Sequence, residues 1–189
     1  MDIYVATKSE ARKQVLKNIR LEFKELTVDF REEILDDPVD TVKYNAIGKN
    51  VIASRIVDGV VITFDTVVYV DGEILGKPVT YEDAYEMLMK LSGKTHKVYT
   101  GVVVGDRERR YFGYGETNVK YINLDEGIIR WYLDREEYWR YAGGYRIQGL
   151  ASLFIEYVEG DFFNVIGVPI QVLLNLLREY GLNPYKYLK

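Results

Sequence analysis

The sequence contains no cysteine and a single histidine, His96. Without cysteine the chain can form no disulfide, no thiolate nucleophile and no cysteine-bound zinc site, and a reducing compartment suits it. One histidine rules out metal sites built from several histidines and disfavours a Ser-His-Asp triad. Chemistry that depends on thiols or on histidine clusters is therefore excluded.

The sequence also lacks the features of a secreted, membrane or nucleic-acid-binding protein. Its first residues, MDIYVATKSEARKQ, bring in charge too early for the apolar stretch of a signal peptide or membrane span. A net charge of −4 argues against binding to a nucleic acid polymer, which usually needs a basic face. With 189 residues, 48% of them hydrophobic, and no linker or repeat, we expect one cytoplasmic domain over residues 1–189.

Hydrophobic periodicity predicts a mixed α/β fold, because helices alternate with both hairpin strands and separated strands. A strand at 3–6 leads through a polar turn into a helix carrying Val15, Leu16 and Ile19, and a broken strand follows at 21–28 before an acidic segment at 29–37. Further strands are expected at 59–70, 73–75, 96–104, 111–121 and 153–158, and further helices from 38 through 53 and at 80–91, 128–133 and 169–181.

Local signals support several of these boundaries. Asp71-Gly72 tolerates the positive φ of a type I′ hairpin turn. Thr80 and Asp83 resemble a capping box, and Gly93 is placed to end the helix that they begin.

Asp65 interrupts GVVITFDTVVYV, the most apolar run of the sequence. A buried, ionised carboxylate is costly unless it is paired, hydrogen-bonded or bound to metal, so Asp65 needs a partner. It could have a structural role, capping a neighbouring element. Alternatively, the basic residues Lys8, Arg12, Lys49 and Lys77 could converge on it and bind a triphosphate with its metal. Residues 6–12 contain no glycine and are not a Walker A loop.

Six motifs occur in a fixed order along the chain. They are ATKSEAR at 6–12, DTVV at 65–68, DGEILGKP at 71–78, LSGKTHKVYTGV at 91–102, AGGYRIQG at 142–149 and EGDFFNVIGVP at 159–169. On these motifs, from Val5 to about Leu177, the chain resembles the Maf family of nucleoside triphosphate pyrophosphatases.

The resemblance implies hydrolysis between the α and β phosphates, with Mg²⁺ or Mn²⁺ as the metal. The family's catalytic aspartate falls on Asp65, as a general base or a metal ligand. A metal-side carboxylate aligns best with Glu32, although Glu33 is an equally short step away. The implied fold is a long twisted sheet flanked by helices, with two lobes around a cleft as in inosine triphosphatases, and such proteins are commonly homodimers.

The resemblance also implies a set of substrate-binding residues. Phosphate-binding positions fall on Arg12, Lys49 and Lys77, with Ser9 and the turn at Thr7 as further donors. Base recognition falls on Gln148 and Thr66, a pair that favours UTP and dTTP.

This sequence departs from the family pattern at a few positions. Glu10 and Ala11 replace a proline and an arginine, and the second of these bears on substrate choice. A lysine is missing near Tyr141, and Arg146 or Arg140 could supply its charge. Two other functions stay open: a nucleotide-binding regulator of cell division or septum formation with little catalysis, and a hydrolase for deaminated purine nucleotides.

The remaining features favour structural roles. His96 lies in a strand beside a turn, and 107–110 reads as a solvated hairpin tip. The aromatic group at 138–141 could stack on a base, but a subunit contact is favoured. Asn164 belongs to a loop and helix cap, with contact to a ligand as the alternative.

Overall fold

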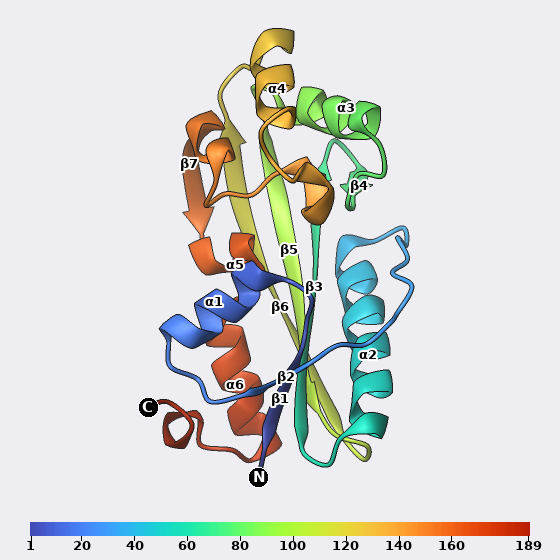
Figure 1. The fold of residues 1–189 in the computed structure, drawn as a ribbon, viewed down its shortest axis with the longest axis vertical. Helices are drawn as coiled ribbons and strands as arrows, with labels where there is room; N and C mark the ends of the chain where they lie inside the picture. Colours follow the sequence, from blue (N-terminus) through green and yellow to red (C-terminus); the bar gives the residue numbers. More distant parts are fainter.

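The computed structural model describes residues 1–189 and contains one seven-stranded mixed sheet (Figure 1). The order is β2-β1-β3-β5-β6-β7, with β4 paired to β3. β1 is parallel to β2 and β3, and the other pairs are antiparallel. The strands are β1 Ile3–Ala6, β2 Lys24–Leu26, β3 Val60–Val70, β4 Glu73–Leu75, β5 Thr95–Gly105, β6 Arg110–Tyr121 and β7 Ile155–Gly160.

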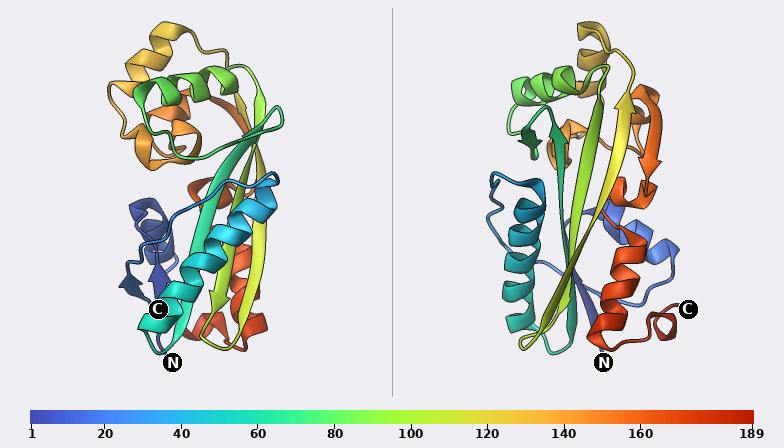
Figure 2. Two further views of the ribbon diagram at one scale, coloured as in Figure 1. Left: turned by 90° about the vertical axis from the view of Figure 1, so that its right-hand side faces the viewer. Right: turned by 180° about the vertical axis from the view of Figure 1, so that it is seen from behind.

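Helices cover both faces of this sheet. In one half of the molecule α2 packs on one face and α6 on the other, while α3 and α4 lie together at the opposite end (Figures 1 and 2). The α-helices are α1 Glu10–Asn18, α2 Pro38–Ile56, α3 Tyr81–Leu91, α4 Glu126–Leu133, α5 Phe162–Ile166 and α6 Ile170–Tyr180. Short 3₁₀ helices are η1 Tyr138–Arg140, η2 Ala142–Gly144, η3 Leu150–Phe154 and η4 Pro184–Lys186. The predicted α/β class is thus confirmed. None of the helices combines the length and hydropathy that a membrane-spanning segment requires.

Two hydrophobic cores divide the molecule into lobes. The α6 lobe is built around residues such as Val5, Leu16, Val104, Leu173 and Leu177. The α3 lobe is built around residues such as Leu88, Leu91, Tyr121, Ile129 and Phe154. On one face of β3, residues 60, 62 and 64 enter the first core and residues 68 and 70 the second. Because side chains alternate along a strand, Thr66 lies on that face at the boundary between the lobes.

The edge of β3 that faces β1 is free in its middle. β1 stops at the pair Ala6–Thr63, and β4 begins only at the pair Val68–Leu75. Residues 64–67 therefore have a strand partner only on the β5 side. This gap places the backbone around Asp65 at the opening between the two lobes.

Most predicted element boundaries hold. Asp71 and Gly72 have φ values of 50° and 86°, as a type I′ turn requires, and the capping box of Thr80 and Asp83 is formed. Gly93 follows the end of α3 with a φ of 66°.

Three predictions were wrong in detail. The strand expected at 21–28 is limited to β2, because the four-residue β1 offers pairing only to Lys24–Leu26. The strand expected at 153–158 begins at Ile155, because Leu150–Phe154 forms η3 and buries Phe154. The 107–110 turn is not simply solvated: Arg107 Nε donates to Ser54 O at 2.9 Å, and Arg110 Nε donates to Asn50 Oδ1 at 3.0 Å, which fixes the hairpin to α2.

His96 lies in the α3 lobe among aromatic rings. Its Nε2 is 2.7 Å from the Tyr145 hydroxyl, its Nδ1 has no partner, and the residue is 1% exposed. Burial lowers the pKa of His96 from 6.5 to about 4. It does not line the cleft described below, which agrees with the expected structural role.

This depressed pKa makes stability depend on pH. As pH falls below about 6.5 the unfolded chain binds the histidine proton first, so stability present above that pH is lost on the way to pH 4. We expect the unfolding free energy to fall by about 2 kcal/mol between pH 6.5 and 4.5, measured by urea denaturation. His96→Gln should lack this component, and an identical decline in both proteins would contradict it.

Candidate functional site

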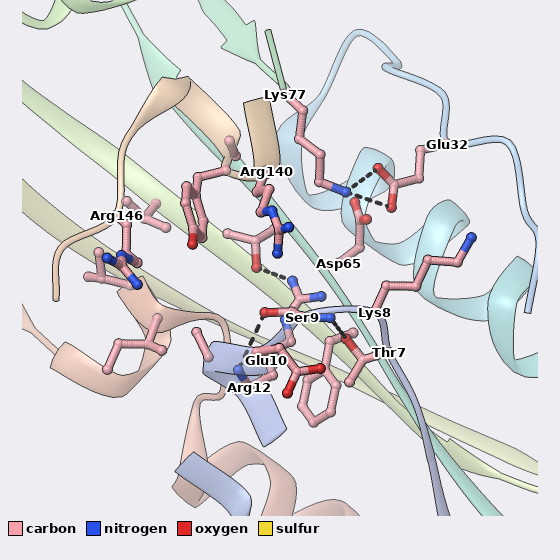
Figure 3. Close-up of a pocket in the computed structure, with 18 of the residues that line it drawn as sticks. Thr7, Lys8, Ser9, Glu10, Arg12, Glu32, Asp65, Lys77, Arg140 and Arg146 are labelled. Atoms are coloured by element: carbon pink, nitrogen blue, oxygen red, sulfur yellow. Dashed lines mark hydrogen bonds and ion pairs between the residues drawn. The ribbon is translucent and has the colours of Figure 1, made fainter. Parts of the chain in front are cut away.

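A cleft of about 930 Å³ opens between the lobes at the free edge of β3. Figure 3 shows Arg146 at one side of it and Glu32, with Lys77, toward the other. All the site residues expected from the sequence line it, namely Thr7, Ser9, Arg12, Glu32, Lys49, Asp65, Thr66, Lys77 and Gln148. The structure therefore brings together segments that are up to 141 positions apart (Thr7 to Gln148).

Asp65 has the partners that its burial demands. Only 4% exposed, it accepts hydrogen bonds from Lys49 Nζ at 2.7 Å on Oδ1 and from Asn45 Nδ2 at 3.0 Å on Oδ2. Burial raises the pKa of Asp65, and the charge of Lys49 together with the two hydrogen bonds opposes that shift. The carboxylate is thus held beside a cation at the cleft.

A glycine lets α2 reach this carboxylate. Asp65 pairs across the sheet with Gly101, and a Cβ at Gly101 would lie 2.9 Å from the carbonyl oxygen of Val42 on α2. Any larger residue would push the helix off the sheet. Close packing of α2 on β5 therefore brings Asn45 and Lys49 within hydrogen-bonding distance of Asp65.

Lys49 joins three oxygen atoms from two parts of the chain, β3 and the segment before α2. Its Nζ lies 2.7 Å from Asp65 Oδ1, 2.7 Å from Glu32 Oε1 and 3.2 Å from the carbonyl oxygen of Phe64. Lys77 Nζ lies 3.1 Å from the other oxygen of Glu32. Partial burial would raise the pKa of Glu32, but the charges and hydrogen bonds of Lys49 and Lys77 outweigh it and lower that pKa to about 2.

Glu32, not Glu33, faces the cleft. Glu33 does not line it and instead bonds to Asn45 through its backbone N–H and carbonyl. Carboxylate and carbonyl oxygens are the donors that Mg²⁺ and Mn²⁺ prefer. Glu32 Oε1 and Asp65 Oδ1 both lie against the ammonium group of Lys49, so these two carboxylates are the oxygen donors that the site would offer to a divalent cation. The chain has no cluster of three or more acidic or histidine side chains that would enclose a metal by itself.

Arg12 connects the start of α1 to the centre of β3. The Ser9 hydroxyl caps α1 by accepting from the Arg12 N–H at 3.3 Å, and the Ser9 N–H donates to Thr7 Oγ1 at 3.2 Å. Arg12 Nη2 donates to Thr66 Oγ1 at 2.7 Å, and Nε donates to the carbonyl oxygen of Gly167 at 3.1 Å. Burial lowers the pKa of Arg12, against the opposing charges of Asp65 and Glu32, yet a guanidinium stays charged in proteins.

Thr66 is part of a hydroxyl chain. Its Oγ1 is 2.9 Å from Thr100 Oγ1, and Thr100 donates to the carbonyl oxygen of buried Asn164. Asn164 lies within α5 and not in the loop expected from the sequence. It also donates to Val98 O and Thr117 Oγ1, so it ties α5 to the sheet and does not line the cleft. The same Thr66 hydroxyl accepts the hydrogen bond from Arg12, a residue that is expected to bind the phosphates.

The cleft also carries arginines where the sequence pattern lacked a lysine. Arg146 Nη2 lies 3.3 Å from Glu136 Oε1, and its guanidinium lies 5.7 Å from the Tyr141 ring centre. Arg140 pairs with Glu137 at 3.1 Å on the surface. Both arginines line the cleft with Gln148, and each is paired with a glutamate that does not line it.

Sequence reasoning missed Asn45, which bonds to Asp65, Phe30, which lines the cleft, and Glu136, which pairs with Arg146. The spacing of Asn45 and Lys49, one helical turn apart, was a signal that both face the same way, but it required knowing that Lys49 faces Asp65.

Comparison with known proteins shows the family to which the chain belongs. The profile described as Maf-like protein matches residues 2–180. The chain belongs to the Maf-like protein family. A Clostridium tetani relative named dTTP/UTP pyrophosphatase is 38% identical over 97% of this chain and 100% of its own length. A Pyrococcus abyssi relative of the same name is 46% identical over 66% of this chain and 67% of its own. The structure of the Staphylococcus aureus Ham1 protein matches with a TM-score of 0.49 and 17% identity over 64% of this chain and 72% of that one, too weak a likeness to inform the Maf-like site.

The two basic residues of the first Maf-like motif should differ in their effect on stability. Arg12→Ala removes charged hydrogen bonds to Gly167 and Thr66 and should lower the unfolding free energy by about 2 kcal/mol. Lys8→Ala removes only an ion pair with Asp29 whose side chains are 66% and 96% exposed, so its change should stay within about 0.5 kcal/mol. Urea denaturation of both variants tests this, and equal losses would be inconsistent with a clamping role for Arg12.

Proposed function

We propose that this protein is a nucleoside triphosphate pyrophosphatase that cleaves between the α and β phosphates of dTTP and UTP. The observation that carries this proposal is the placement of Asp65 in the cleft beside Lys49, with Glu32, Lys77 and Arg12 around it. The names of its Maf-like relatives support the choice of substrate.

The cleft offers several groups that can bind phosphate. Lys49, Lys77 and Arg12 all line it, together with the turn at Thr7 and Ser9 that precedes α1. Cationic side chains and helix N-termini are the groups that bind phosphate in proteins. We assign the phosphates to this region.

Glu32 and Asp65 would hold a divalent cation, Mg²⁺ or Mn²⁺, which supplies charge neutralisation for the phosphate oxygens when bound. Lys49 and Lys77 keep Glu32 ionised at neutral pH, because they lower its pKa to about 2.

Asp65 is assigned as the general base. A water oxygen bonds to the α phosphorus, and a proton of that water passes to the Asp65 carboxylate. The bond between the α phosphorus and the bridging oxygen breaks, so pyrophosphate leaves with that oxygen and a nucleoside monophosphate remains. Burial, which raises the pKa of Asp65, makes the carboxylate a better proton acceptor. Asp65 Oδ2 accepts a hydrogen bond from Asn45. Asp65 Oδ1 accepts from Lys49 and is therefore the oxygen on the side of the other charged groups of the site.

Gln148 is assigned to the base. Its side chain is exposed at the cleft, and its amide can both donate and accept, which a uracil or thymine edge requires. Arg146 or Arg140 supplies the charge that the missing lysine near Tyr141 would give. We also propose that the enzyme acts in the cytoplasm as a homodimer; Trp139, half exposed, is available for a subunit contact.

A nucleotide panel tests the activity. Purified protein with Mg²⁺ should release pyrophosphate from dTTP and UTP faster than from ATP, GTP, CTP or ITP. Tight nucleotide binding with no release from any of them would favour the regulator alternative. Faster release from ITP than from UTP would favour a hydrolase for deaminated purines.

Asp65→Asn should lower kcat for dTTP by about 100-fold or more, because it removes the general base and a negative charge at the metal while preserving shape. Pyrophosphate release measures this, with circular dichroism to check the fold. Asp71→Asn is the matched control, since Asp71 lies in the exposed hairpin turn and asparagine tolerates its φ of 50°. If the two variants are equally active, Asp65 is not the base.

A further inference from the structure

The acidic segment that carries Glu32 has no regular structure of its own. No backbone–backbone hydrogen bond involves residues 28–36, which lie between β2 and α2. A carboxylate on such a segment would sample many positions, because nothing in the local backbone fixes it. The position of Glu32 therefore depends on side chains from elsewhere.

Asn45 on α2 supplies the missing backbone partner. Its Oδ1 accepts from the Glu33 N–H at 2.9 Å, and its Nδ2 donates to the Glu33 carbonyl at 2.9 Å. The amide thus bonds to Glu33 in both directions, as a neighbouring strand would. This fixes the peptide directly after Glu32.

The same amide group also holds Asp65. Its Nδ2 donates to Asp65 Oδ2 at 3.0 Å, so both N–H bonds of the group are used. Asn45 is 2% exposed, and a buried amide with its donors satisfied is a rigid one. The bond from Asn45 to Asp65 is separate from the two bonds that hold Glu33, so one amide positions both the strand carboxylate and the acidic segment.

Lys49 lies one helical turn after Asn45 on the same side of α2. It contacts the two carboxylates whose positions Asn45 sets, each at 2.7 Å. Packing reinforces the arrangement: the Phe30 ring lies against Gly48, where an added Cβ would come within 2.2 Å of it. One helix thus sets the segment, the strand carboxylate and their shared cation.

We propose that Asn45 is a positioning residue that fixes Glu32 and Asp65 relative to each other, so that both carboxylates border the place where one divalent cation would bind. This rests on the proposed function in assigning that cation to the two carboxylates. Groups that orient metal ligands typically change metal affinity or activity by about 10- to 100-fold when removed.

Asn50 provides a matched control on the same helix. It is also buried, donating through Nδ2 to Val61 O at 2.8 Å and accepting from Arg110 Nε at 3.0 Å, but it contacts neither carboxylate. Asn45→Ala should raise the Mg²⁺ concentration for half-maximal dTTP hydrolysis by about tenfold or more. Asn50→Ala should leave it within about twofold. Urea denaturation of both variants separates the kinetic effect from lost stability.

Mn²⁺ alone, followed by the electron paramagnetic resonance signal of the free ion, gives a readout without turnover. Asn45→Ala and the space-filling Asn45→Leu should bind Mn²⁺ about tenfold more weakly than the unaltered protein and Asn50→Ala. An unchanged Mn²⁺ affinity and Mg²⁺ requirement in folded Asn45 variants would overturn the proposal, as would equal shifts in Asn50→Ala. If the unaltered protein hydrolyses no nucleotide, the proposed function fails, while Mn²⁺ binding still decides the role of Asn45.

Discussion

One ammonium group organises the site. Lys49 comes from α2, Glu32 from the acidic segment and Asp65 from β3, and the lysine brings the two carboxylates together by bonding to both. Two carboxylates this close would repel each other without a cation between them. Attraction to Lys49 and Lys77 outweighs the burial of Glu32 and lowers its pKa, whereas burial and the charge of Glu32 raise the pKa of Asp65.

The sheet makes this arrangement accessible. A carboxylate in the middle of a fully paired strand would be sealed between neighbouring strands and helices. Here β1 ends at Ala6 and β4 begins its pairing at Val68, so the strand that buries Asp65 is open on one edge where the lobes separate. Burial, which raises the pKa of Asp65, and access to the cleft therefore coexist at one residue.

Much of the fold could be read from the sequence because its signals are local. The β-branched run at 60–70, the Asp71-Gly72 turn and the Thr80 cap each act over a few residues, and all three appear as expected. The limits of β2 and the docking of Arg107 on α2 could not be read, because they depend on how long a partner strand is and on which helix lies nearby. The site shows the same division. The need of Asp65 for a partner follows from its burial alone, whereas the other expected site residues came from the family motifs. Asn45 could be found from neither, because it is outside the motifs and its contact with Asp65 depends on how α2 packs on the sheet.

The central strands have a consequence for how the molecule holds together. β3 contributes side chains to both cores, and β5 and β6 do so as well. Neither lobe has a complete set of strands of its own. Unfolding of one core would therefore disrupt the backbone hydrogen bonds between strands on which the other core depends. We therefore expect the two lobes to unfold in a single cooperative step. The cleft between them should persist only while the less stable of the two cores is folded.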